Sequence, residues 1–239
     1  MKIINFKSEP KQSFFAPEWS YYMCEDESFD DIVYFEKIAK IILDKEKNVI
    51  DSNQNNYNNY NKKHNTTFDG QTGLGSKSLT SRSPFFNVLS WNEPEIKSLI
   101  SFIHLKYIEF LSSLKVDRRK AWIQCWANVM RDGEEIKQHI HASHSHTWLG
   151  GHLTVSCNNT STFYVNPMMR SEGKQTFESI NKVGKIAFFQ NNIPHYTNKH
   201  KGLTERISIA FDIVLDERLT VYPEERKSNF ILFDNPLEK

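Results

Sequence analysis

The chain has 239 residues and a formal net charge of +1, with 38% hydrophobic and 25% charged residues. This composition is typical of a globular protein and excludes a disordered, collagen-like or coiled-coil chain. The near-zero charge gives no electrostatic argument for a nucleic-acid partner. Because no apolar run approaches the roughly 20 residues that cross a bilayer and the start lacks a secretion signal, we expect a cytoplasmic protein without a membrane partner, folded as one domain over 1–239.

The N-terminal part, 1–120, is expected to be helical. Apolar residues recur at steps of three and four over 28–47, which predicts an amphipathic helix. A second helix is expected to begin at a capping box formed by Asn92 and Glu95 and to run to about Lys115.

Residues 51–83, between these two helices, lack any periodicity. They are rich in Asn at first and in Gly, Ser and Thr later, which predicts a long loop. Such a loop is either an insertion or a lid over a site. As a lid it would use Tyr57, Tyr60 and Arg82 as its contacts with a substrate.

The chain after residue 120 changes to short segments rich in β-branched and aromatic residues. We expect strands at 121–130, 148–156, 162–165, 185–190 and 206–214. Strands without helices between them favour an antiparallel sandwich or barrel. The expected fold is therefore mainly β with N-terminal helices, with its β core at 121–215 and a charged, peripheral tail at 216–239.

Histidines are concentrated in the middle of the chain. Five of the nine lie within 139–152, at His139, His141, His144, His146 and His152. Histidine is the commonest metal-binding side chain, and residues i and i+2 of an extended strand share a face. His139 and His141 can therefore present two ring nitrogens to one ion, and His195, beyond the 185–190 strand, is a candidate third ligand.

The segment 206–213 alternates in polarity. Its even positions place Arg206, Ser208 and Asp212 on one face, and its odd positions carry only Ile and Phe. A guanidinium binds a carboxylate with two donors, and a serine hydroxyl two residues away adds a third. Arg206 and Ser208 are thus candidates for holding an acid.

The order of these parts, from His-x-His through a glycine, a strand and Pro-His to Arg-Ile-Ser-Ile, resembles the Fe(II)- and 2-oxoglutarate-dependent oxygenases over 121–215. It is most similar to uncharacterised members from marine phages and bacteria with a His-x-His variant. The resemblance implies a double-stranded β-helix of the jelly-roll or cupin type. It also implies iron at His139, His141 and His195, and 2-oxoglutarate at Arg206 and Ser208, with Tyr164 as a further candidate contact.

His141 departs from the usual family pattern, because most members have a carboxylate at this position. The second ligand could alternatively be a neighbouring carboxylate or imidazole, and the candidates are Asp132, Glu134, Glu135, His144 and His146. Three histidines also occur in dioxygenases that use no 2-oxoglutarate and in closed zinc sites.

The leading expectation is an Fe(II)- and 2-oxoglutarate-dependent oxygenase that releases succinate and CO2 and hydroxylates an unidentified substrate. A protein side chain, a small molecule and a nucleobase are all open as substrates. The alternatives are a cupin-like metal- or ligand-binding protein without turnover and a three-histidine dioxygenase without 2-oxoglutarate.

Overall fold

The computed structural model describes residues 1–8, 15, 18–141, 147–168 and 176–237. Within these residues, strands form a seven-stranded sheet in the order β1-β2-β7-β4-β9-β3-β10 and a three-stranded sheet in the order β6-β5-β8, with all neighbouring pairs antiparallel. The strands are β1 (Lys2–Lys7), β2 (Ser20–Asp26), β3 (Ala121–Met130), β4 (Thr147–Ser156), β5 (Ser161–Val165), β6 (Thr176–Ile180), β7 (Ile186–Gln190), β8 (His195–Thr197), β9 (Arg206–Leu215) and β10 (Ile231–Asp234).

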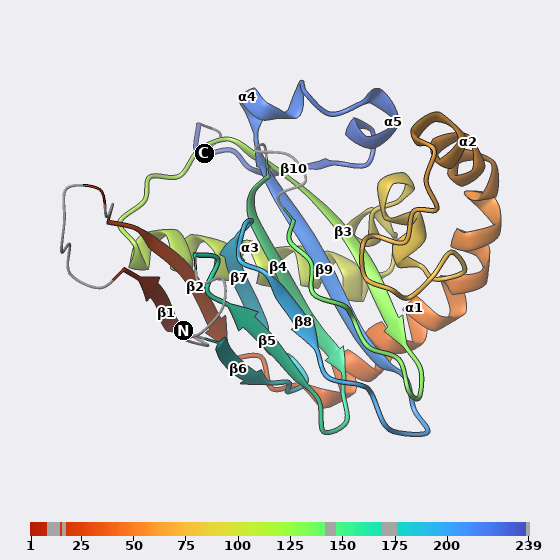
Figure 1. The fold of residues 1–239 in the computed structure, drawn as a ribbon, viewed down its shortest axis with the longest axis horizontal. Coiled ribbons are helices and arrows are strands. Elements are labelled where there is room, and N and C mark those ends of the chain that lie inside the picture. The colour runs from red at the N-terminus through yellow and green to blue at the C-terminus, as the bar shows by residue number, and fades with distance from the viewer. Residues whose placement is uncertain (9–14, 16–17, 142–146, 169–175, 238–239) are drawn as a thin grey trace.

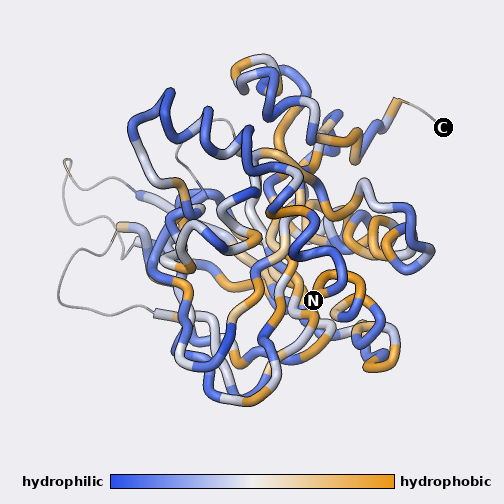
Figure 2. Tube along the Cα trace, turned by 90° about the vertical axis from the view of Figure 1, so that its right-hand side faces the viewer, coloured by the Kyte–Doolittle hydropathy of each residue, from blue (hydrophilic) through white to orange (hydrophobic). Residues whose placement is uncertain are grey.

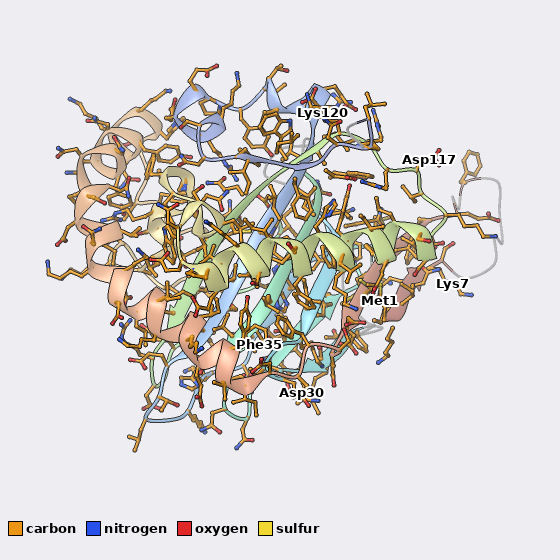
Figure 3. The ribbon with its side chains drawn as sticks, turned by 180° about the vertical axis from the view of Figure 1, so that it is seen from behind. Met1, Lys7, Asp30, Phe35, Asp117 and Lys120 are labelled. Carbon is orange, nitrogen blue, oxygen red and sulfur yellow. The ribbon has the colours of Figure 1, made fainter. Side chains whose placement is uncertain are left out.

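Helices cover one face of the large sheet, and the small sheet lies on the other (Figure 1). Seen from behind, α3 crosses the large sheet and α1, which carries Phe35, runs beside it (Figure 3). The helices are α1 (Ile32–Ser52), α2 (Gln54–His64), α3 (Pro94–Ser113), α4 (Asp216–Leu219) and α5 (Glu224–Lys227), with short 3-10 turns η1 (Thr80–Phe85) and η2 (Val88–Ser90). This arrangement confirms the expected antiparallel β architecture.

Side chains alternate along β9, so that one face of the strand joins the hydrophobic core and the other face lines a cavity. Ile207, Ile209 and Phe211 belong to the main hydrophobic core beneath the helices. Arg206 and Ser208 lie on the opposite face and line a cavity. The period-two pattern of this strand is therefore confirmed.

In Figure 2 the hydrophobic stretches gather toward the middle of the molecule and most hydrophilic stretches lie outside.

The helical part differs from expectation within 51–83 and at the start of α3. The segment 51–83 is not a loop throughout, because α1 continues to Ser52 and α2 follows at Gln54–His64. The polar α2 is held by tertiary contacts: Tyr57 is buried and stacks against the Arg82 guanidinium, 3.8 Å from the ring centroid. In addition, α3 begins with Pro94 in its first turn after Glu93, without a side-chain cap, so the capping box at Asn92 was wrong.

Both ends of the described chain contribute to the large sheet. Strand β1 pairs with β2, β2 pairs with β7, and β10 pairs with β3. The tail at 216–239 is therefore not peripheral, since Asp234 is 1% exposed and Arg226 reaches the cavity. In the parts of the chain that the structure describes, no helix is long and apolar enough to cross a membrane.

Candidate metal and carboxylate site

A cavity lies on the inner face of the large sheet. Side chains of β3, β4, β5, β8 and β9 line it, together with the segment that carries His139 and His141. Phe68, residues 70–72, Ser83 and Arg226 of α5 also line it. The cavity therefore collects residues from Phe68 to Arg226 along the chain.

Three of the predicted site residues lie together at this cavity. One ring nitrogen from each of His139, His141 and His195 lies within 4.8 Å of the other two. The backbone fixes this convergence, because His139 and His195 form an antiparallel bridge and the His141 amide donates to the Asn191 carbonyl at 3.0 Å. No other such group of ligand-type side chains occurs among the described residues.

Each of the three imidazoles has its Nδ1 atom engaged. The Nδ1 of His139 lies 2.9 Å from the Lys137 carbonyl, and that of His195 lies 3.1 Å from the Ile193 carbonyl. A carbonyl oxygen can only accept, so these two rings carry their proton on Nδ1. The Nε2 atoms are consequently left as unprotonated electron-pair donors, which is the state that binds a metal ion.

Burial keeps these rings neutral. Burial, followed by the charge interaction with His141, lowers the pKa of His139 to about 4. Burial likewise lowers the pKa of His195 well below its ordinary value, with His139 and His141 contributing in the same direction. At neutral pH these two imidazoles are therefore uncharged ligands.

The third imidazole differs in its partner. His141 Nδ1 lies 2.7 Å from Oδ1 of Asp212, a residue of β9 that is 3% exposed. The other carboxylate oxygen of Asp212 accepts from Arg226 Nη2 at 3.1 Å. The sequence analysis placed Asp212 on the correct face but gave it no role, and it gave none to Arg226. The alternation of β9 could have indicated Asp212, whereas nothing local to α5 indicates Arg226.

A buried arginine that pairs with none of the described carboxylates lies at the same cavity. Arg206 is 2% exposed and donates from Nη2 to Thr162 Oγ1 at 3.3 Å. Its Nη1 lies 3.8 Å from Met130 Sδ, and its Nε has no hydrogen-bond partner. None of the described carboxylates forms a salt bridge with it. Burial lowers the pKa of Arg206 to about 10, so it remains a cation at neutral pH.

The predicted serine lies on the same face. Ser208 lines the cavity and accepts a 3.4 Å hydrogen bond from Asn128 Nδ2, while Thr80 donates to the Asn128 oxygen at 2.5 Å. These bonds orient Asn128 as a donor toward Ser208, so the serine retains its own proton for a ligand. Arg206 and Ser208 together offer donors to an anion.

Tyr164 does not line the cavity itself, but it contacts a residue that does. It is fully buried, and its hydroxyl lies 2.5 Å from Nε2 of His152, which lines the cavity. Burial, followed by the positive charge of Arg206, lowers the pKa of His152 to about 3. Tyr164 therefore supports a neutral imidazole at the cavity wall, and His152 is a wall residue that sequence reasoning did not select.

The alternative ligands from the sequence lie elsewhere or outside the described residues. Asp132 accepts from the Gly202 amide at 3.0 Å, and Glu134 accepts from the Arg131 amide at 2.6 Å. Neither these carboxylates nor Glu135 belongs to the cluster that forms around the histidines. His144 and His146 lie outside the described residues.

Only the later part of the predicted lid reaches the cavity. Phe68 and residues 70–72 line it, and Thr72 accepts from the Lys137 amide at 2.8 Å. Tyr57, Tyr60 and Arg82 do not line it; the Arg82 guanidinium is held by the Ser76 carbonyl at 3.0 Å and the Gln54 side chain at 2.7 Å. Arg82 is therefore a structural contact of α2.

Comparison with known proteins places the fold. No protein-family model and no curated protein sequence matches the chain. A prolyl-4-hydroxylase of Pseudomonas putida matches with a TM-score of 0.53 at 7% identity, over 81% of this chain and 92% of that one. A Trichoplax adhaerens prolyl hydroxylase, in complex with a hypoxia inducible factor oxygen degradation domain peptide fragment, matches with a TM-score of 0.52 at 9% identity, over 84% and 87%.

A third structure is an oxidoreductase of the 2OG-Fe(II) oxygenase family from Burkholderia pseudomallei. It matches with a TM-score of 0.41 at 14% identity, over 52% of this chain and 60% of that one, so the chain spans less than two thirds of that protein. At these identities the two prolyl hydroxylases establish a likeness in fold. The chain has a double-stranded β-helix fold, like that of these two prolyl hydroxylases.

Proposed function

We propose that this chain is an Fe(II)- and 2-oxoglutarate-dependent oxygenase that hydroxylates a substrate and releases succinate and CO2. One observation carries the proposal: a single cavity holds three converging imidazoles, at His139, His141 and His195, and the buried Arg206, with which none of the described carboxylates forms an ion pair. The proposal includes the finer resemblance to the His-x-His members of marine phages and bacteria.

The donor set fits the metal. Imidazole nitrogens suit iron, nickel, copper and zinc, and three protein ligands leave coordination positions for other molecules. His139, His141 and His195 would hold the ion through their Nε2 atoms, because the Nδ1 atom of each ring contacts a protein oxygen. When bound, iron and 2-oxoglutarate supply the oxidising chemistry, and the protein supplies binding and orientation.

The cation at the cavity fits the cosubstrate. Burying a charge without a partner is costly, so a buried arginine is normally paired or serves a ligand. Arg206 Nε has no partner, and Ser208 retains a proton on the same face. We assign these two residues to the carboxylate of 2-oxoglutarate that is remote from the metal, with Thr162 orienting the guanidinium. Tyr164 acts through His152.

Anaerobic titration tests the proposal. Protein loaded with Fe(II) is titrated with 2-oxoglutarate while the weak visible charge-transfer absorption of a chelated keto acid is recorded. We expect a saturable band in the wild-type protein and slow release of succinate when air is admitted. Tight metal binding without a band would reject the use of 2-oxoglutarate.

The two alternative functions, a closed metal-binding site and a dioxygenase without 2-oxoglutarate, require different arrangements of the same residues. A closed structural metal site needs a fourth ligand, and none of the described His, Cys, Asp and Glu side chains joins the three histidines. A three-histidine dioxygenase without 2-oxoglutarate gives Arg206 no function. Cobalt substitution tests for the closed metal site, because a four-coordinate ion absorbs far more strongly than a five- or six-coordinate one. Titration with 2-oxoglutarate tests for the dioxygenase that does not use this cosubstrate.

A further inference from the structure

The three histidines are held in two different ways. The Nδ1 atoms of His139 and His195 donate to main-chain carbonyls, whereas that of His141 contacts a carboxylate oxygen of Asp212 at 2.7 Å. A main-chain carbonyl carries a partial charge, but a carboxylate carries a full negative charge and forms a stronger hydrogen bond. His141 is thus the one ligand candidate with an anion directly behind it.

The position of Asp212 makes this contact rigid. Asp212 lies in the middle of β9, which is paired with β3 on one side and β4 on the other. Its backbone partner on β4 is Gly150, and a Cβ atom built on Gly150 would lie only 2.8 Å from His141 Nδ1. The glycine therefore leaves the space in which the ring lies against the carboxylate.

Arg226 also contacts Asp212, but this interaction is weaker than the one between Asp212 and His141. The Arg226 side chain is 23% exposed, and its Nη2 lies 3.1 Å from Asp212 Oδ2. The side chains of His141 and Asp212 are only 4% and 5% exposed. Water therefore screens the charge of Arg226 more than it screens the contact between Asp212 and His141. Arg226 orients the carboxylate, and its Nε is in turn held by Gln124 Oε1 at 3.3 Å.

We infer that Asp212 is a positioning residue of the metal site: its carboxylate fixes His141 with Nε2 toward the ion and supplies, from behind the ring, the negative charge that three neutral ligands lack. This inference rests on the proposed metal binding at His139, His141 and His195. A carboxylate behind a ligating imidazole also raises the basicity of that ligand.

Metal titration of four variants tests the inference. Asp212→Asn keeps an acceptor for His141 but removes the charge, whereas Asp212→Leu removes both. Arg226→Met removes the outer ion pair with Asp212 and the hydrogen bond to Gln124, and leaves the Asp212–His141 contact in place. Asp216→Asn is the matched control, because Asp216 bonds Trp122 and Lys120 outside the cavity. The dissociation constant of Co(II) is measured by competition with a chelator, and unfolding of the metal-free variants reports their fold.

We expect the Co(II) affinity to fall roughly tenfold in Asp212→Asn and up to roughly a hundredfold in Asp212→Leu, with no change in Asp216→Asn. Arg226→Met should show a smaller loss than Asp212→Asn. Wild-type affinity in a folded Asp212→Leu variant would overturn the inference, and wild-type affinity in Asp212→Asn would overturn the role of the charge.

A second readout separates this inference from the proposed function. Ring 15N chemical shifts of the metal-free protein report the His141 tautomer, which we expect to carry its proton on Nδ1 in the wild type and to become mixed in Asp212→Leu. An unchanged tautomer in that variant would contradict the positioning role. Failure of the wild-type protein to bind any metal would instead reject the proposed function, while the tautomer would still report on the contact.

Discussion

His139 and His195 face each other across an antiparallel bridge in which each main-chain N–H donates to the carbonyl of the other residue, at 3.1 and 3.0 Å. Their ring centroids lie 4.3 Å apart. Two of the three candidate ligands are therefore fixed by the backbone of segments that are remote in sequence. The backbone pairing therefore sets the relative position of these two candidate ligands.

Removing one of these imidazoles should abolish tight metal binding. We expect His195→Ala to weaken Co(II) binding by more than about a hundredfold, because it removes a ligand and not merely the support of one. Competition with a chelator measures the effect. His64→Ala, on the exposed face of α2, is the matched control and should bind as the wild type does. Tight binding by His195→Ala would exclude His195 from the site.

Replacing the unpaired arginine should separate binding from stability. We expect Arg206→Met to weaken 2-oxoglutarate binding by about 3 kcal/mol, or roughly a hundredfold, because a buried carboxylate would lose its partner. Without the cosubstrate the same variant should be at least as stable as the wild type, because the buried cation has no ion-pair partner among the described residues and its Nε is unbonded. Denaturant unfolding with and without 2-oxoglutarate measures both effects.

Arg82 provides the matched control for that experiment. It is 2% exposed, like Arg206, but its guanidinium donates to Ser76 and Gln54 and stacks on Tyr57. Arg82→Met should therefore destabilise the protein by about 1–3 kcal/mol and leave cosubstrate affinity unchanged. If both methionine variants lost the same stability, Arg206 would be a structural arginine.

A glycine beside the triad should be intolerant of substitution. A Cβ at Gly150 would lie 2.8 Å from His141 Nδ1 and 2.7 Å from Phe189 Cε2. We expect Gly150→Ala to displace the His141 ring and weaken Co(II) binding about tenfold. Gly133→Ala is the control for metal affinity, since a Cβ there would meet nothing within 4 Å; its cost should be confined to the backbone strain of a φ of +80°. Unaltered binding by Gly150→Ala would show that His141 can shift without loss.

The strands that carry the site could be predicted from the sequence because their patterns are local. The predicted strand at 121–130 coincides with β3, and the alternation in β9 separated Arg206 and Ser208 from the core isoleucines. A period of two is a property of the strand itself, so it is visible without tertiary information. The convergence of His139 and His195 required the family pattern, since their pairing across the backbone joins distant segments.

The two features that the sequence did not predict, helix α2 and the packing of the tail, depend on tertiary contacts. Helix α2 is rich in asparagine and polar on most faces, and burial of Tyr57 against Arg82 stabilises it. The tail looked peripheral because its charges are frequent, yet Arg226 pairs with Asp212 of β9 and Asp234 pairs with Arg118, which precedes β3. Pairing partners of charged residues cannot be identified from spacing, so neither contact was predictable.

The buried carboxylate of β10 should contribute to stability against acid. Burial alone would raise the pKa of Asp234, but hydrogen bonds from Arg118 and His104 outweigh burial and lower the pKa below the ordinary value of 3.8. Because the pKa is lower in the folded state, the stabilisation is fully present above about pH 4 and is lost as the pH falls through the folded-state pKa. We expect Asp234→Asn to cost about 1–3 kcal/mol at pH 7 and to lose less stability than the wild type on acidification.

Denaturant unfolding at several pH values between 7 and 2 measures this difference. Asp44→Asn is the control, because its carboxylate is 63% exposed and pairs only with Lys40 on the same helix face. Exposed pairs of this kind contribute less than about 1 kcal/mol, so the control should follow the wild type at every pH. If Asp234→Asn lost stability as steeply as the wild type below pH 4, other carboxylates would control acid unfolding, and the contact of β10 with Arg118 would have little influence on stability.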